Sequence, residues 1–235
     1  MRPPKTRTRT CLLAIGLTLI PLAGWAQTGV EDQGVFNILV NGRQVGTEEF
    51  SIRQSGVGEN SEFIATGRVQ VLLPSGSLDL TSRLRSSGFQ ANPVAYEVTV
   101  GGDAARRIVG TVGSGRFSAK IMTPSGEQLR EYVASSGATV VDEGIAHHYY
   151  FVARRTRSGS LPIIIPRENR QTMAAVEDRG EEQMTIGGTA TTLYHLVMRP
   201  QGGEDRHVWV DVLGRVIRVE IPDRSYVAVR AEVPR

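Results

Sequence analysis

The chain has 235 residues, with 27 basic and 24 acidic side chains and a single cysteine. This length can bury a sizeable core without disulfide bonds, and so balanced a charge gives no electrostatic support for nucleic-acid binding. The one cysteine, Cys11, lies in the N-terminal segment. Disulfides, thiolate nucleophiles and cysteine metal sites are therefore excluded from the rest of the chain.

Residues 1–26 have the organisation of a secretory signal peptide. A basic start precedes an apolar run from Cys11 to Gly24, and the segment ends on the small residue Ala26. The apolar run is too short to span a bilayer comfortably. We therefore predict Sec-type export with cleavage after Ala26, a periplasmic or secreted protein, and no transmembrane segment after cleavage. A retained membrane anchor is the alternative.

Residues 27–235 are expected to form a single domain of short β-strands. The strongest early signal is Asn41-Gly42, which favours a tight hairpin between the alternating runs that flank it. Further strands are expected over residues 63–73, 78–85, 94–100, 106–112, 116–123, 128–134 and 139–141. Glycine stands at nearly every turn, and this regular spacing indicates an antiparallel meander.

The strand pattern is interrupted near residues 143–155. Ile145, Tyr149 and Val152 recur at helical spacing, and Asp142 is a suitable N-cap, so we predict a short helix. A strand rich in aromatic residues is the alternative. The apolar run 161–166 lies between prolines and is expected to be an extended edge segment, because proline cannot donate to a β-ladder.

Alternating runs resume in the last third of the chain. They cover residues 173–178, 184–186, 189–198, 208–212, 216–221 and 226–233, and Gly187-Gly188 predicts a second tight hairpin. So many strands in one open sheet would curl or close. We therefore predict an all-β fold with one short inserted helix, as a strongly curled antiparallel meander or unclosed barrel.

The histidines give little support for catalysis or metal binding. His147 and His148 are adjacent, so on a helix they point about 100° apart and do not easily bind one metal ion. A symmetric hairpin would place His195 opposite Asp211, and such a His–Asp pair could supply two members of a hydrolase triad. The Gly-x-Ser-x-Gly motif that would supply the serine is not present. We expect a non-catalytic protein without metal or cofactor. A hydrolase that uses His195 and Asp211 is the less favoured alternative.

Both faces of the hairpin over residues 189–212 are largely apolar. Because Val208, Val210 and Val212 share one face, Trp209 is expected on the other, facing the helix. The candidate cavity lining is Tyr149, Val152, Leu193, His195, Trp209, Asp211 and Leu213. Such a cavity would suit a lipid-like or other apolar ligand. Helix-on-sheet packing with a filled interior is the alternative.

Two segments resemble exported bacterial proteins of domain-of-unknown-function families. Residues 34–48, with Val40-Asn41-Gly42-Arg43, resemble their opening hairpin, and residues 209–220 resemble their closing hairpin. Those proteins are similar to the unclosed antiparallel barrels of the periplasmic lipoprotein carriers, whose curved sheet wraps short helices over an apolar cavity. The resemblance implies the fold. It does not imply lipoprotein transfer, because a single helical segment is a smaller lid than the carriers have.

The expected function is therefore a non-catalytic periplasmic protein that binds a lipid-like or other apolar ligand in the concavity of its sheet. The alternative is an envelope interaction or scaffolding protein with a packed interior. Peripheral contact with the cell envelope fits either function.

Overall fold

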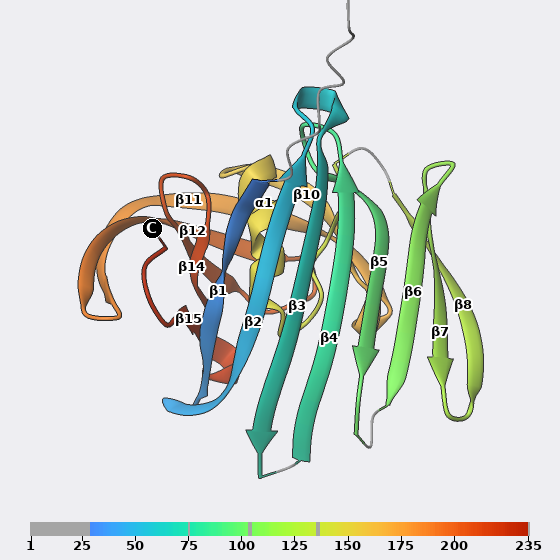
Figure 1. Cartoon of the computed structure of the whole chain (residues 1–235), viewed down its shortest axis with the longest axis horizontal. Coiled ribbons are helices and arrows are strands. Elements are labelled where there is room, and N and C mark those ends of the chain that lie inside the picture. Colours follow the sequence, from blue (N-terminus) through green and yellow to red (C-terminus); the bar gives the residue numbers. More distant parts are fainter. Residues whose placement is uncertain (1–28, 75, 103–104, 135–136, 235) are drawn as a thin grey trace, which may run out of the picture.

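The computed structural model describes residues 29–234 except 75, 103–104 and 135–136 (Figure 1). The predicted signal peptide lies outside the described residues. Within them, the one α-helix is α1 (Tyr149–Arg155), and no helix is long and apolar enough to cross a membrane.

Fifteen strands of the described chain form one sheet, in the order β8-β7-β6-β5-β4-β3-β2-β1-β15-β14-β13-β12-β11-β10-β9. The first eight are β1 (Gly29–Val40), β2 (Arg43–Ser55), β3 (Glu62–Leu73), β4 (Gly76–Ser87), β5 (Asn92–Val100), β6 (Arg106–Gly113), β7 (Arg116–Thr123) and β8 (Gly126–Val133). The others are β9 (Thr139–Val140), β10 (Gly159–Ile165), β11 (Arg170–Ile186), β12 (Thr189–Pro200), β13 (Arg206–Val210), β14 (Val216–Ile221) and β15 (Tyr226–Arg230). Every pair is antiparallel except β9 with β10. The predicted fold class is confirmed.

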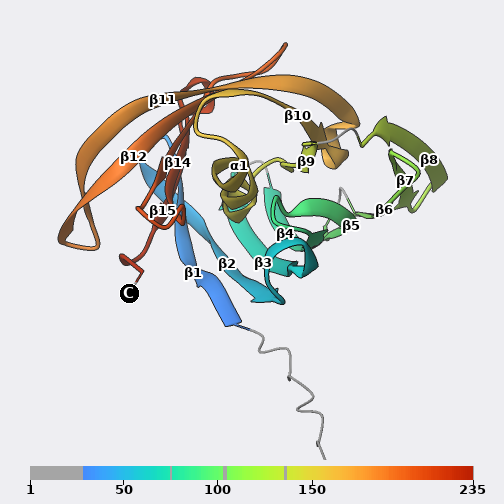
Figure 2. The same cartoon turned by 90° about the horizontal axis from the view of Figure 1, so that it is seen from above.

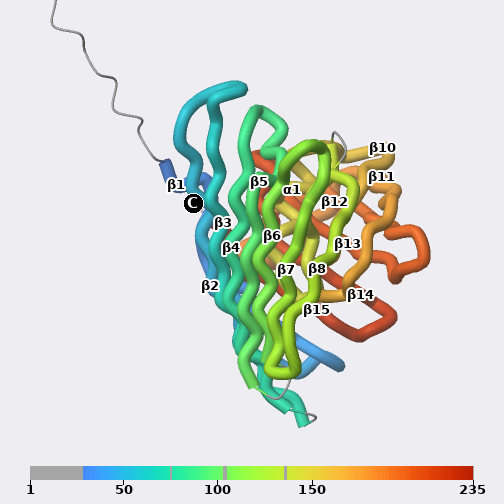
Figure 3. Tube along the Cα trace, turned by 90° about the vertical axis from the view of Figure 1, so that its right-hand side faces the viewer, coloured from blue at the N-terminus to red at the C-terminus, as the bar shows by residue number. Residues whose placement is uncertain are grey.

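The sheet rolls up around α1 without closing. Seen from above, β10 to β12 arch over the helix on one side and β1 to β5 lie on the other (Figure 2). The short edge strand β9 lies against β5, and the line between them is the seam of the rolled sheet. The strands β6, β7 and β8 continue beyond this seam as a wing (Figure 2), and they face the viewer in Figure 3. The end of β8 is tied across the seam because the Gln171 side-chain amide donates to the Val133 carbonyl and accepts from the Val133 N–H.

The two predicted tight hairpins are present. Asn41 and Gly42 have φ values of 50° and 72°, and Gly187 and Gly188 have φ values of 54° and 82°. Positive φ at both central residues defines the type I′ class of turn, whose twist matches that of the flanking strands. The turn residues therefore determine where β1 and β2, and β11 and β12, reverse direction.

Gly42→Val is expected to destabilise the protein by about 1–2 kcal/mol, because a β-branched residue resists positive φ. The measurement is the urea midpoint of unfolding. Gly42→Asn is the control, since asparagine tolerates the left-handed region and should leave the midpoint close to that of the wild type. Equal midpoints for the valine variant and the wild type would contradict the prediction.

Two apolar clusters lie on opposite faces of the sheet. The main core fills the concave side, where α1 packs against inward-facing residues of strands such as Phe36, Ile52 and Leu84. A smaller outer core lies on the other face and contains Ile186, Leu193, Trp209 and Ile217. Because β12, β13 and β14 contribute to both cores, they are apolar on both faces.

The predicted helix is confirmed, but it begins later than expected and is capped differently. A 3₁₀ turn (Ala146–His148) precedes α1, and Asp142 does not cap it. Instead, the buried carboxylate of Glu48 on β2 accepts hydrogen bonds from the Ala146 N–H at 2.7 Å and the His147 N–H at 3.1 Å. The free N–H groups at the start of the helical segment are thus satisfied by a strand on the facing wall.

Glu48 belongs to an interior polar network with Asp142, His147 and His148, all of them buried. His147 Nδ1 lies 2.6 Å from the Glu48 carboxylate, and its ring packs closely over β3. A Cβ atom at Gly67 would lie 2.5 Å from His147 Cε1, so any side chain at this position would force the His147 ring to shift.

Asp142 connects three parts of the interior: strand β5, the turn after β10, and the 3₁₀ turn before α1. Its carboxylate accepts hydrogen bonds from the Tyr96 hydroxyl at 2.6 Å and from Arg167 Nε at 3.0 Å, and its backbone N–H donates to His148 Nδ1 at 3.1 Å. Burial, followed by the nearby Asp142 charge, raises the pKa of Tyr96 well above its usual value. Tyr96 therefore remains a neutral donor to the aspartate.

Two expectations about strands need correction. The runs 173–178 and 184–186 belong to one long strand, β11, which is interrupted only by a bulge between Asp178 and Glu181. The segment 161–166 is mostly β10, but β10 is not an edge strand because it pairs with β11 on one side and β9 on the other. Pro162 is accommodated there because the parallel pairing with β9 is very short and includes only Ile163 and Ile164.

Candidate functional site

The structure separates the residues that were expected to line one cavity. Tyr149 and Val152 lie in the main core, 5% and 3% exposed, whereas Leu193 and Trp209 lie in the outer core on the opposite face of the sheet. The expectation that Trp209 faces the helix was wrong. The valine face of β13 points to the helix, and Trp209 therefore points away from it.

The hairpin register also differs from the expectation. His195 lies opposite Trp209, two residues from the predicted partner Asp211, because the loop between β12 and β13 is not symmetric. Asp211 forms a turn after β13, where its carboxylate accepts from the Leu213 and Arg215 N–H groups and pairs with the Arg215 guanidinium. Leu213 is 70% exposed in that turn, away from the other residues that were expected to line the cavity.

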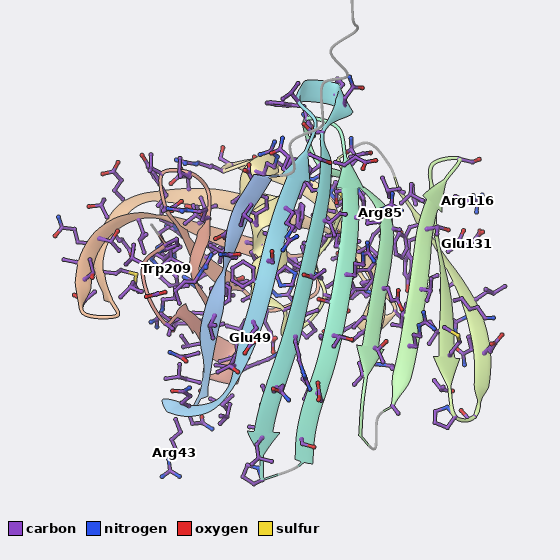
Figure 4. The ribbon with its side chains drawn as sticks, viewed as in Figure 1. Arg43, Glu49, Arg85, Arg116, Glu131 and Trp209 are labelled. Carbon is purple, nitrogen blue, oxygen red and sulfur yellow. The ribbon has the colours of Figure 1, made fainter. Side chains whose placement is uncertain are left out.

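His195 and Trp209 instead form an outer cluster with two residues that the sequence did not single out, Glu182 and His207. Figure 4 labels Trp209 on the β11–β14 side of the molecule, far from the exposed Arg116–Glu131 ion pair of the wing. Glu182 accepts hydrogen bonds from His195 Nδ1 at 2.8 Å and from Trp209 Nε1 at 2.7 Å. His195 Nε2 then lies 2.9 Å from His207 Nδ1.

The rings of the outer cluster are stacked. The His195 and Trp209 centroids are 4.4 Å apart with 11° between planes, and the His195 and His207 centroids are 5.1 Å apart with 29° between planes. Arg218 lies over the Trp209 ring at 5.5 Å, which is within the range of a cation–π contact. His195 is therefore oriented both by stacking and by hydrogen bonds to its two nitrogens.

The pKa values of two titratable groups in this cluster are lowered, for different reasons. The hydrogen bond from Trp209, with a further contribution from His195, lowers the pKa of Glu182. Burial, followed by repulsion from His195, lowers the pKa of His207. At neutral pH the cluster therefore contains a carboxylate that accepts two hydrogen bonds and a histidine that favours the neutral form.

The strand geometry explains why Glu182 was overlooked. The bulge between Asp178 and Glu181 changes which side chains of β11 share a face, so the alternation pattern read from sequence does not carry across it. Its effect is to place Glu182 opposite Leu193, on the same face as Trp209. The faces of residues beyond this bulge could be assigned only once the register was known.

The outer cluster does not contain the expected pair of His195 and Asp211. Both ring nitrogens of His195 already have partners, Glu182 and His207, and neither is a hydroxyl. The predicted partner Asp211 is paired with Arg215. Across the part of the chain that the structure describes, no three His, Cys, Asp or Glu side chains are arranged to hold a metal ion.

A cleft of about 540 Å³ lies where β1 begins, beside the end of β15. Its walls include Asp32, Arg215, Arg230 and Glu232, and the buried Arg230 guanidinium donates to Asp32 at 2.5 Å. Burial raises the pKa of Asp32 despite this cation. Charged walls of this kind do not suit an apolar ligand.

The stability of the protein should fall in mild acid because of His148. Its Nδ1 accepts the Asp142 N–H, and burial, followed by repulsion from His147 and Arg167, lowers its pKa well below 6.5. Below about pH 6.5 the His148 imidazole binds a proton in the unfolded chain, whereas in the folded chain it stays neutral. The free energy of unfolding should therefore drop by up to about 1.4 kcal/mol per pH unit as the pH falls from 6.5 to 5.

Urea unfolding between pH 7.5 and 5 tests this expectation. His148→Asn keeps an acceptor for the Asp142 N–H and should show a shallower decline than the wild type. His207→Asn, at a partly exposed position, is the control and should change the decline less. The raised pKa values of Asp32 and Glu143 act in the opposite direction at lower pH, so the comparison stops at pH 5. Equal slopes for His148→Asn and the wild type would contradict the assignment.

Comparison with known structures supports the fold. The chain is similar to a β-barrel-like protein of the domain of unknown function DUF1849 from Brucella abortus, with a TM-score of 0.51 and 7% sequence identity. The match covers 84% of this chain and 93% of that one. This likeness shows a β-barrel-like fold. No protein family and no curated protein matches the sequence.

Proposed function

We propose that this is an exported, non-catalytic interaction protein, in which the curled sheet is a scaffold with a packed interior. The observation that supports this most strongly is the filling of the concave side by α1. Tyr149, Phe151 and Val152 of the helix are at most 5% exposed and pack with the inward-facing strand residues. The space that an apolar ligand would occupy is taken by the protein's own side chains.

The polar anchors of α1 favour a scaffold over a carrier. To admit a lipid, the helix would have to move away from Glu48, which binds two backbone N–H groups and His147. Breaking buried hydrogen bonds to a charged group is costly because each partner is left unsatisfied. A carrier whose helix is held in this way would bind and release an apolar ligand poorly.

Export is proposed from the basic, apolar and small-residue order of residues 1–26. Intact mass spectrometry of the protein from a periplasmic extract should show a chain that begins at Gln27. A species that retains Met1 in this fraction would contradict cleavage.

Native mass spectrometry of the untagged protein from the same extract tests the scaffold. We expect it at its bare mass or in complex with another protein, and organic extraction of the purified protein should yield no stoichiometric lipid. A bound lipid at one molecule per chain would overturn the packed-interior proposal and favour the apolar carrier.

A further inference from the structure

The arrangement of His195 and His207 has a use that the packed scaffold does not require. We propose that these two histidines form a binding site for a divalent transition-metal ion on the outer face of the sheet, with copper(II) bound most tightly. The site is independent of the proposed scaffolding function. It differs from a closed structural metal site because solvent completes the coordination.

The distance between the two nitrogens fits a shared ion. His195 Nε2 and His207 Nδ1 are 2.9 Å apart, from neighbouring strands β12 and β13. Two imidazole nitrogens bound to one metal at about 2.0–2.1 Å lie about 2.8–3.0 Å apart when they are in cis positions of a square-planar or tetragonal complex. Binding requires the two rings to rotate, because in the hydrogen bond one nitrogen donates to the other and both lone pairs must instead be directed at one ion.

Glu182 prepares His195 as a ligand. Its carboxylate accepts a hydrogen bond from the Nδ1–H of His195. The lone pair of the neutral ring is therefore on Nε2, the nitrogen that faces His207. A carboxylate behind a histidine ligand fixes the ring tautomer and raises its basicity. The second oxygen of Glu182 is held by Trp209 Nε1, and Trp209 also stacks on His195.

His207 can supply the second lone pair by a change of tautomer. In the neutral pair its Nδ1 carries the hydrogen that His195 accepts. Moving this hydrogen to Nε2 frees Nδ1 for a metal ion, and His207 is only partly buried, so its environment permits that exchange with solvent. His195 is 8% exposed, which places the ion near the surface on the His207 side.

The donor set selects the class of ion. Imidazole suits copper, nickel and zinc, whereas magnesium and calcium prefer oxygen ligands. Among divalent ions, affinity for a given nitrogen site rises to copper(II) and then falls at zinc. Copper(II) and nickel(II) accept a site with two imidazoles in cis positions and water at the remaining positions. Structural zinc instead prefers a closed tetrahedral site made of four protein ligands.

Trp209 provides the readout, because it is the sole tryptophan after the predicted removal of Trp25 and its ring lies 4.4 Å from that of His195. Copper(II) chloride titrated into the untagged mature protein at pH 7.5 should quench Trp209 fluorescence saturably, with one ion per chain. Magnesium chloride should leave the emission unchanged. Electron paramagnetic resonance of the copper(II) complex should show coupling to two imidazole nitrogens.

Variants locate the site. His195→Gln and His207→Gln should each abolish the saturable quenching, with circular dichroism unchanged. Glu182→Ala should weaken copper(II) binding by about 10–100-fold, as expected for loss of an orienting carboxylate. Glu181→Ala is the matched control, since this exposed glutamate points to the other face of β11 and should leave binding unchanged.

Two results would overturn the proposal. The first is saturable binding of the same affinity in either histidine variant, which would place the ion elsewhere. The second is quenching that stays linear with copper(II) concentration and is equal in all variants, which would show only collisions with the metal.

Discussion

Replacing Glu48 by alanine is expected to destabilise the protein by about 3–5 kcal/mol, the range found when one partner of a buried charged group is removed. The carboxylate is fully buried and accepts hydrogen bonds from Ala146 N–H, His147 N–H and His147 Nδ1. Without it, three donors at the start of the helical segment lose their partner in a place that water does not reach. We expect the 3₁₀ turn and α1 to detach from β2 before the sheet unfolds.

The measurement combines urea unfolding with amide hydrogen exchange of residues 146–155. Glu49→Ala is the matched control, because the neighbouring glutamate is exposed on the opposite face of β2 and should change the free energy of unfolding by less than about 0.5 kcal/mol. A Glu48→Ala variant as stable as Glu49→Ala would show that the network does not anchor the helix.

Asp142→Ala should have an effect of similar size, again about 3–5 kcal/mol. The aspartate is buried and accepts from the Tyr96 hydroxyl and from Arg167 Nε, so its removal leaves a guanidinium and a phenol without their acceptor. Because Tyr96 lies on β5 and Asp142 follows shortly after β9, the loss should also loosen the contact between β5 and β9.

Asp142→Ala is tested by urea unfolding together with the ultraviolet titration of tyrosine. Removal of the carboxylate takes away one of the causes that raise the pKa of Tyr96, so the titration of this tyrosine should begin at lower pH. Asp223→Ala, at an exposed position within another 3₁₀ turn, is the control. Stability like that of the control would contradict a structural role for Asp142.

Local signals in the sequence were sufficient for most of the strands, the two tight turns and the presence of the helix. Asn41-Gly42 and Gly187-Gly188 specify their turns because few other residues adopt positive φ at low cost. The number of strands predicted a curled sheet, since a flat sheet of that size would leave an apolar face in water. The helical spacing of Ile145, Tyr149 and Val152 identified an inward-facing stripe, which packs in the main core.

The candidate site could not be predicted in the same way. β13 is apolar on both faces, so alternation alone did not show which face meets the helix, and the loop after β12 shifted the register by two residues. Glu48 caps a helical segment 98 positions later in the chain. Glu48 and Glu49 looked alike in sequence, and only the tertiary fold distinguishes a buried cap from an exposed side chain.

The pairing of β1 with β15 has a consequence for how the chain reaches this state. The two strands are hydrogen-bonded to each other at the middle of the sheet, although they come from opposite ends of the described chain: Arg230 contacts Asp32 from 198 positions away. Contacts between such distant segments make folding slow. Until the last strand has been synthesised, the edge of β1 that pairs with β15 has no partner in the centre of the sheet. We expect late intermediates that still depend on protection from aggregation, and a chain truncated before Tyr226 that never becomes resistant to protease.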